Sequence, residues 1–162
     1  SNEAGLTYLG RSVRLDGRHA FESGKTALSV GLGANLVLPA RQGGDDGAKG
    51  VYGGGFDLPI LFGVTSRADV YSLWVGPRGG VEVLRGHLDD AVVSGAGLTP
   101  GDLDATHAFV GAVLGARAGF RHVHAAIELN AAYHHASGTI AGEAATLEQV
   151  TITPSGGLTL SF

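Results

Sequence analysis

Apolar residues alternate with small or polar residues over long stretches of this chain. In the segment 26–38, "TALSVGLGANLVL", Leu28, Val30 and Leu32 share one set of alternate positions, and Gly, Ser and Ala dominate the other. Because successive side chains of a β-strand point to opposite faces of a sheet, this period predicts strands. The same alternation recurs in segments 52–62, 108–120, 122–134 and 150–162.

Three further segments complete a predicted set of about eight strands: 6–14, 71–75 and 81–88. Gly and Pro interrupt regular structure, so "GPRGG" at 76–80 is a predicted turn, and "SRAD" at 66–69 is predicted as another. Polar or flexible composition predicts loops at 15–24, 41–50, 89–105 and 136–148. No linker or repeat divides the chain, so residues 1–162 are expected to form a single domain.

Composition narrows the class of protein further. The 28 glycines argue against a helical fold, and the 44% of hydrophobic residues argue against disorder. The net charge of −4 and the lack of a basic stripe argue against a nucleic-acid partner. Cysteine is absent, which excludes disulfides and thiolate chemistry. A chain without an initial Met is expected to be processed, and an N-terminal lipid anchor stays an open alternative.

Two kinds of barrel fit the alternation, and they differ in which face is inside. A soluble, lipocalin-like barrel would turn the apolar face inward, whereas a membrane barrel turns it outward to lipid. The non-apolar face is mostly Gly, Ala, Ser and Thr with few charges, which suits the crowded interior of an eight-stranded barrel. The fold class predicted is therefore all-β: a closed, antiparallel, up-and-down transmembrane barrel of about eight strands.

The sparse charges are then expected to pair inside the barrel, because isolated buried charges are too costly to persist. The predicted polar network of the lumen consists of Asp57, Glu82, Arg117, His122, His124, Glu128 and Asn130.

Aromatic residues lie near the ends of the predicted strands on the apolar face, as in the interfacial girdles of membrane barrels. They are Tyr52, Phe62, Tyr71, Phe120, Tyr133 and Phe162. With the terminal "LTLSF", these features make the chain resemble the small OmpA/OmpX-type barrels of Gram-negative bacteria. The resemblance implies a location in the outer membrane of the cell envelope, in contact with its lipids, including lipopolysaccharide. It implies no particular function.

Few motifs point to chemistry. No phosphate-binding loop, dinucleotide fingerprint or nucleophile elbow is present, and no cofactor is expected. "GGDDG" around Asp45 and Asp46 lacks the ligands of a calcium loop and is interpreted as a solvated loop. The histidines at 122, 124, 134 and 135 do not supply three or four convergent ligands, so no metal site is predicted.

One arrangement is similar to the outer-membrane lipid A deacylase family, an eight-stranded barrel with a His/Ser/Glu triad near its C-terminus. The carrying residues are His135 and Ser137 in an H-x-S pair, followed by Glu148. Strand parity places all three on the lipid face, and with a periplasmic C-terminus they would lie at the extracellular end. The family usually has Asn after the Ser, whereas this chain has Gly138.

Three functions follow as hypotheses. The favoured one is a non-enzymatic outer-membrane barrel with a filled polar lumen and no wide pore, which is structural or binds a partner through its loops at 89–105, 136–148 and 15–24. The second is a membrane esterase that acts on lipid A through Ser137, His135 and Glu148. The third is a soluble, lipocalin-like barrel that binds an apolar ligand.

Overall fold

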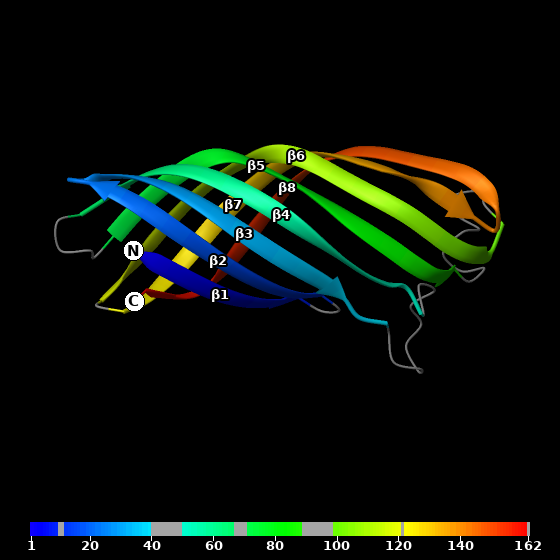
Figure 1. Cartoon of the computed structure of the whole chain (residues 1–162), viewed down its shortest axis with the longest axis horizontal. Coiled ribbons are helices and arrows are strands. Elements are labelled where there is room, and N and C mark those ends of the chain that lie inside the picture. The colour runs from blue at the N-terminus through cyan, green and yellow to red at the C-terminus, as the bar shows by residue number, and fades with distance from the viewer. Residues whose placement is uncertain (10–11, 40–49, 67–70, 89–98, 121, 162) are drawn as a thin grey trace.

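The computed structural model describes residues 1–9, 12–39, 50–66, 71–88, 99–120 and 122–161, which form one all-β sheet of eight strands (Figure 1). The strands are β1 (Asn2–Leu9), β2 (Ser12–Ser23), β3 (Thr26–Val37), β4 (Tyr52–Thr65), β5 (Tyr71–Leu88), β6 (Gly101–Phe120), β7 (Val123–Ile140) and β8 (Glu143–Ser161). No helix that is long and apolar enough to cross a membrane occurs in the part of the chain that the structure describes.

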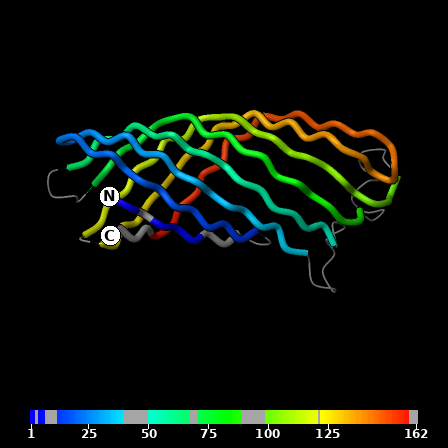
Figure 2. Tube along the Cα trace, in the orientation of Figure 1, coloured from blue at the N-terminus to red at the C-terminus, as the bar shows by residue number. Residues whose placement is uncertain are grey.

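Each strand pairs antiparallel with the next one along the chain, so the sheet is an up-and-down meander. Both termini lie at the same end of the molecule (Figure 2). Residue pairs can be followed without a break around the sheet from Leu6 on β1 to Glu148 on β8. The path runs Leu6, Leu15, Ala34, Phe56, Val81, Ala108, His135, Glu148. The sheet curves until β8 comes back beside β1.

The seam between β1 and β8 is paired only in part. Its pairs are Glu3↔Ser161 and Ala4↔Leu160, whereas β1 pairs with β2 over its whole length. The predicted closed barrel is therefore not closed along the rest of this seam. Extending the register of the two seam pairs places Leu6 opposite Leu158. The path around the sheet from Leu6 ends instead at Glu148, so β8 is displaced by ten residues where the sheet returns to β1. A stagger of this size goes with strands that are strongly tilted, by roughly 35–45° in closed barrels.

The predicted turn "GPRGG" is wrong, because residues 76–80 lie inside β5. None of these residues has a positive φ. On the inner face of β5, Gly80 and Gly76 alternate with the large side chains of Glu82, Arg78 and Trp74, so the glycines provide space rather than a change of direction.

The predicted single strand 6–14 is also wrong, since it combines parts of β1 and β2. The apolar positions change parity between Leu6 and Leu15, and this change marks the missed hairpin. Eight strands are nevertheless present, because one prediction merged two strands and another divided β5. The segment 15–24, predicted as a loop, is strand up to Ser23. Its polar residues Asp16 and Arg18 line the lumen, so their polarity does not mark a loop.

The loops predicted at 89–105 and 136–148, at the end of the molecule opposite the termini, are too long. Residues 101–105 belong to β6, and most of 136–148 belongs to β7 and β8, which join through a two-residue turn. Residues 41–49, 67–70 and 89–98 lie outside the described residues, so only the flanks of the remaining predicted loops are placed. "SRAD" does fall in the connection between β4 and β5.

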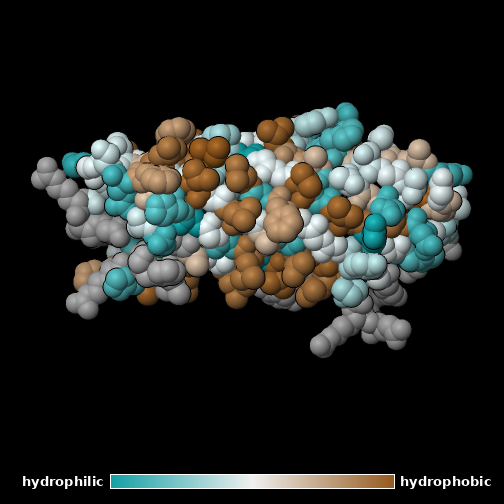
Figure 3. All heavy atoms as spheres, in the orientation of Figure 1, coloured by the Kyte–Doolittle hydropathy of each residue, from teal (hydrophilic) through white to brown (hydrophobic). Residues whose placement is uncertain are grey.

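The apolar face of the sheet is outside, as the sequence predicts. Phe56 is 64% exposed, whereas its neighbour Asp57 is 5% exposed. Apolar side chains gather over the middle of the visible surface, and polar ones gather toward its ends (Figure 3). We define the apolar belt as the outward-facing residues Leu15, Phe21, Leu28, Val30, Leu32, Leu36, Phe56, Leu58, Phe62, Leu73, Val75, Val81, Val110, Leu114, Ile127, Leu129, Val150 and Ile152. Of the predicted girdle, Tyr52, Phe62, Tyr71, Phe120 and Tyr133 are exposed, and Phe162 lies outside the described residues.

The turn between β7 and β8 generates a test of backbone strain. Ala141 and Gly142 are its central residues, with φ of 52° and 82°. Because Ala is strained at positive φ, Ala141→Gly should raise the free energy of unfolding by about 0.5–1 kcal/mol. Ala144→Gly, in the adjoining strand, should lower it by a similar amount, about 0.5–1 kcal/mol. Urea unfolding of both variants measures the difference, and a loss of stability in both would contradict the assigned turn.

Candidate functional site

The candidate site is the lumen, the space that the curved sheet encloses. Inward-facing polar side chains from seven strands are joined there into what we call the lumen network. Along β5, the inward residues Glu82, Arg78, Trp74 and Ser72 mark four successive layers of it, running from the loop end toward the termini.

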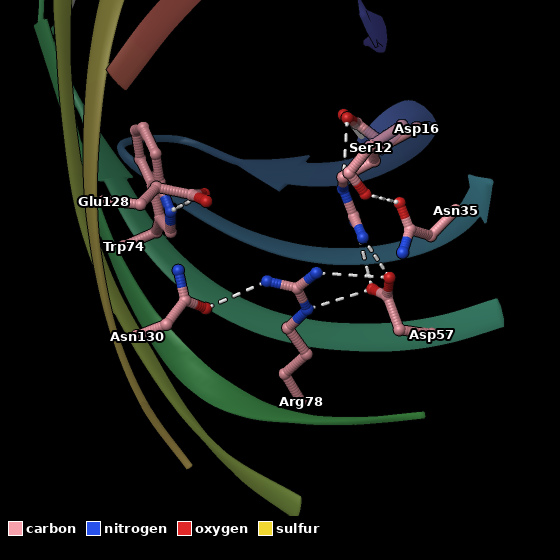
Figure 4. A network of polar contacts seen from close by, with 9 residues as sticks. Ser12, Asp16, Asn35, Asp57, Trp74, Arg78, Glu128 and Asn130 are labelled. Atoms are coloured by element: carbon pink, nitrogen blue, oxygen red, sulfur yellow. Dashed lines mark hydrogen bonds and ion pairs between the residues drawn. The ribbon is translucent and has the colours of Figure 1, made fainter. Parts of the chain in front are cut away.

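Asp57 is the centre of the second layer (Figure 4). Its carboxylate accepts hydrogen bonds from Arg14 Nη1 and from Arg14 Nη2, the latter at 3.0 Å. Arg78 donates to the same carboxylate through Nε at 2.9 Å and Nη2 at 3.1 Å, and its Nη1 donates to Asn130 Oδ1 at 2.9 Å. Two fork-shaped cations thus hold one buried anion, which is the geometry that makes such pairs strong.

The first layer is a chain of hydrogen bonds that crosses six strands. It begins with Ser12 Oγ donating to Asn35 Oδ1 at 2.8 Å, and Asn35 Nδ2 donates to Glu82 Oε1 at 2.7 Å. His107 Nδ1 lies 3.4 Å from Glu82 Oε2, and His107 Nε2 lies 2.8 Å from His134 Nδ1. His134 Nε2 lies 2.7 Å from Thr151 Oγ1, which ends the chain.

The imidazole tautomers in the first layer follow from this connectivity. A neutral imidazole has one N–H donor and one acceptor nitrogen. If His107 donates to the Glu82 carboxylate, its Nε2 must accept from His134, and His134 must accept from Thr151. The whole chain is then oriented toward Glu82.

The third and fourth layers are smaller. The indole N–H of Trp74 donates to Glu128 Oε1 at 3.0 Å, and the guanidinium of Arg18 lies 4.9 Å from the Trp74 ring centre. In the fourth layer, Arg117 Nε donates to Ser72 Oγ at 3.2 Å. Leu61, Trp74 and Val113 form a small apolar cluster on the same inner surface.

Two glycines explain how these layers fit. A Cβ at Gly33 would clash with Arg14 and Asp57, and a Cβ at Gly115 would clash with the indole of Trp74. The small residues that the sequence analysis assigned to a crowded interior are therefore the positions against which the largest lumen side chains lie.

The structure places most of the predicted lumen residues on the inner face, but with different partners. Asp57, Glu82, Arg117, Glu128 and Asn130 join the layers described above, and His124 is buried nearer the termini. His122 is a correction: it is exposed in the turn between β6 and β7, because β7 begins one residue later, at Val123.

Sequence reasoning missed both partners of Asp57. Arg78 was hidden in the predicted turn at 76–80, and Arg14 was at the end of a strand with the wrong bounds. Asn35, Trp74, His107, His134 and Thr151 were also missed as network members. Continuing the alternation of β5 through "GPRGG" would have placed Arg78 and Trp74 on the same face as Glu82.

The outer face of β5–β8 becomes polar toward the loop end. This polar rim consists of Arg85, His87, Asp102, Asp104, Thr106, His135, Ser137, Thr139, Thr146 and Glu148. It contains three pairs between neighbouring strands: Arg85–Asp104 at 3.4 Å, His87–Asp102 at 3.0 Å and His135–Glu148 at 3.3 Å.

The three predicted triad residues all lie in the polar rim, but only two are in contact. His135 Nδ1 faces Glu148 Oε1, and the two residues are directly opposite in the register of β7 and β8. Ser137 lies two residues along on the same face, opposite Thr146. Within the described part of the chain, Ser137 makes no side-chain hydrogen bond with His135. The arrangement contains the carboxylate–histidine half of a triad.

The lumen also contains a cavity of about 440 Å³. Arg14, Arg18, Asp57, Trp74 and Glu128 line it, and so do residues of β1 and β8 on both sides of the seam. Among the described residues, no group of three or more His, Asp or Glu side chains is placed to hold a metal ion.

Comparisons of the chain with protein families, with curated proteins and with solved structures found no match. The function must therefore be argued from the sites themselves.

The layer around Asp57 generates a stability prediction. Asp57→Asn should lower the free energy of unfolding by about 3–5 kcal/mol, because it removes a buried anion and leaves two partly buried guanidiniums without it. Asp104→Asn breaks the exposed Arg85–Asp104 pair and should cost less than about 1 kcal/mol. Urea unfolding followed by Trp74 fluorescence compares them, and equal effects would mean that Asp57 is not the centre of the lumen network.

Proposed function

We propose that this chain is an integral β-barrel of a bacterial outer membrane, with a polar, side-chain-filled lumen and no wide pore. Its role is structural, or it binds a partner through the loop end. The observation that carries this proposal is the inverted partition of side chains: polar and charged groups are buried in the lumen network, and the apolar belt is exposed.

The length of the apolar belt supports a lipid environment. On β7 the outward positions are apolar from Val123 to Tyr133, a stretch of eleven residues. A tilted strand needs about 9–11 residues to span the hydrocarbon core. His135 and Ser137, which follow, then lie at the membrane border, where polar side chains return to water.

The two ends of the molecule differ in a way that supports a partner-binding role at one of them. The strands β5–β8 carry the polar rim beyond the apolar belt, and the long connections 38–51 and 89–100 leave from the same end. At the end with the termini, the connection between β2 and β3 is only Gly24 and Lys25. Membrane barrels have short periplasmic turns and longer extracellular loops, so the rim is the candidate contact surface.

The soluble, lipocalin-like alternative needs the reverse orientation. Its apolar face would line the interior, and the surface would carry dispersed charges. In the observed orientation, by contrast, a water-soluble protein would leave Phe56, Ile127 and Ile152 facing water, and soluble monomers rarely tolerate large exposed apolar patches.

A membrane esterase is the second candidate, and the His135–Glu148 contact favours it. Glu148 would orient His135, whose Nε2 would take the proton of Ser137 when a lipid acyl ester is attacked. The site lies at the border of the apolar belt toward the loop end, where acyl chains of an outer-leaflet lipid such as lipid A would begin.

The membrane proposal is tested by cell fractionation and by electrophoresis with and without boiling. The parent protein should be found in the outer-membrane fraction and should change mobility when it is boiled. In lipid vesicles, Leu114→Arg, in the middle of the apolar belt, should lower stability by about 2–4 kcal/mol, and Thr139→Arg in the polar rim by about 0–1 kcal/mol. Recovery of the parent as a soluble monomer without detergent would overturn the proposal.

The esterase candidate makes a separate prediction. If it holds, the purified protein releases fatty acid from lipid A in mixed micelles, and Ser137→Ala abolishes release because the nucleophilic oxygen is removed. Thr139→Ala, on the same face two residues further along, should leave the rate unchanged. An inactive parent, or a Ser137→Ala variant that retains activity, would eliminate this candidate and leave the membrane proposal intact.

A further inference from the structure

The seam between β1 and β8 is the weakest contact in the sheet. Among the described residues, two residue pairs join these strands, and the segment from Thr151 to Thr159 on β8 has no partner on β1. Unpaired peptide groups of this kind are costly in a hydrocarbon environment, where no water satisfies them. If the chain spans a membrane, something must therefore occupy or hydrate this edge.

The cavity of the lumen reaches this seam. Its lining includes Ala4, Gly5 and Leu6 on β1 and the segment 155–158 on β8, together with Trp74 on the other side of the lumen. Thr153, Ser155 and Gly157 have the parity of the inner face but are exposed, whereas the inner-face residues Ser29, Asp57 and Ser72 are buried. The inner face of β8 is thus accessible beside the unpaired part of the seam.

The chemistry of the lining defines what fits there. The cavity lining carries three arginines, Arg14, Arg18 and Arg78, and four carboxylates, Asp16, Asp57, Glu82 and Glu128, so its charges nearly balance and offer little net charge to a ligand. Phe109, Ala126 and Ala132 are partly exposed on the inner face and supply an apolar surface, whereas Leu61 and Val113 are only 2% exposed. Thr153, Ser155 and the unpaired edge of β8 supply hydroxyl and peptide groups for hydrogen bonds. A volume of about 440 Å³ falls within the usual range for small-molecule sites, ~300–1,000 Å³.

We propose that the cavity binds a single-chain lipid with an uncharged polar head, such as a monoacylglycerol, which enters sideways from the bilayer between β1 and β8. The alkyl chain lies along the apolar surface of Phe109, Ala126 and Ala132, and the head group bonds to the open edge of β8. This inference rests on the proposed membrane location. It adds a ligand site that the filled lumen alone does not imply.

Trp74 is a built-in reporter for this site, because it is the only tryptophan of the chain and faces the cavity. The protein is reconstituted in phosphatidylcholine vesicles, and a monoacylglycerol with a brominated chain is added as a quencher. A ligand in the cavity should remove most of the Trp74 emission. A two-chain phosphatidylcholine with the same brominated chains is too wide to enter and should quench far less, since the wall of the sheet separates it from the indole.

An engineered disulfide that closes the seam reversibly allows quenching to be compared in the same protein with the seam open and closed. Leu6→Cys with Leu158→Cys places two thiols opposite each other in the extended register, in a chain without other cysteines. Oxidation should abolish quenching by the monoacylglycerol, and reduction of the same sample should restore it. The pair Leu15→Cys and Ala34→Cys, between the paired strands β2 and β3, should leave quenching unchanged in both states.

A second variant tests the cavity without a crosslink. A Cβ at Gly157 would meet no atom within 4 Å, so Gly157→Leu adds volume to the opening without a backbone clash. It should weaken quenching while the mobility shift on boiling persists.

Three results would overturn the inference: equal quenching by one-chain and two-chain lipids, quenching that survives oxidation of the 6–158 pair, or equal quenching by a brominated fatty acid. The last would remove the selection for an uncharged head. Each can occur in a correctly inserted protein, so these results are distinguishable from failure of the membrane proposal, which the mobility shift on boiling reports separately.

Discussion

The fold depends on how the carboxylate of Asp57 is satisfied inside the sheet. A buried anion is tolerated only where cations and hydrogen-bond donors replace its water. Arg14 from β2 and Arg78 from β5 do this from two directions, and Arg78 extends the contact to Asn130 on β7. One cluster thereby ties together four strands, β2, β4, β5 and β7, that lie far apart in the sequence. Such a cluster keeps polar side chains inside and so leaves the apolar ones outside.

Because polar side chains lie inside and apolar side chains outside, the molecule cannot be stabilised in the way a soluble sheet is. A soluble sheet gains its stability from an apolar core, but here the buried apolar cluster is limited to a few residues around Trp74. The lumen is held instead by directional contacts in layers, with glycines placed where the large side chains need space. Under the proposed membrane location, a bilayer provides the environment for the apolar surface, because its hydrocarbon thickness matches the length of the apolar belt.

The polar rim and the seam are two departures from a uniform outer surface, and they suggest different uses. The rim ends the apolar surface on β5–β8 and presents the His135–Glu148 pair at the border where a lipid head group would lie. The seam interrupts the sheet on the opposite side of the lumen from β5, where residues of β1 and β8 line the cavity. In the proposed membrane setting, the rim would meet lipid head groups and the seam would meet lipid chains.

The sequence by itself determined the all-β class, because a period of two is a local property of a strand. The antiparallel meander and the outward apolar face were predicted from the barrel class that the small, weakly charged second face favours, because the period alone fits either orientation. The sequence also identified Asp57, Glu82, Glu128 and Asn130 as inner residues, since parity decides which residues share a face. It could not show that the glycines of 76–80 provide space inside a strand instead of forming a turn, and Arg78 was missed for this reason. Gly76 and Gly80 are needed because atoms of neighbouring strands leave no room there for a larger residue. Only the tertiary structure decided the partners of each charge, the incomplete seam and the cavity behind it, because these depend on register between strands that are distant in sequence.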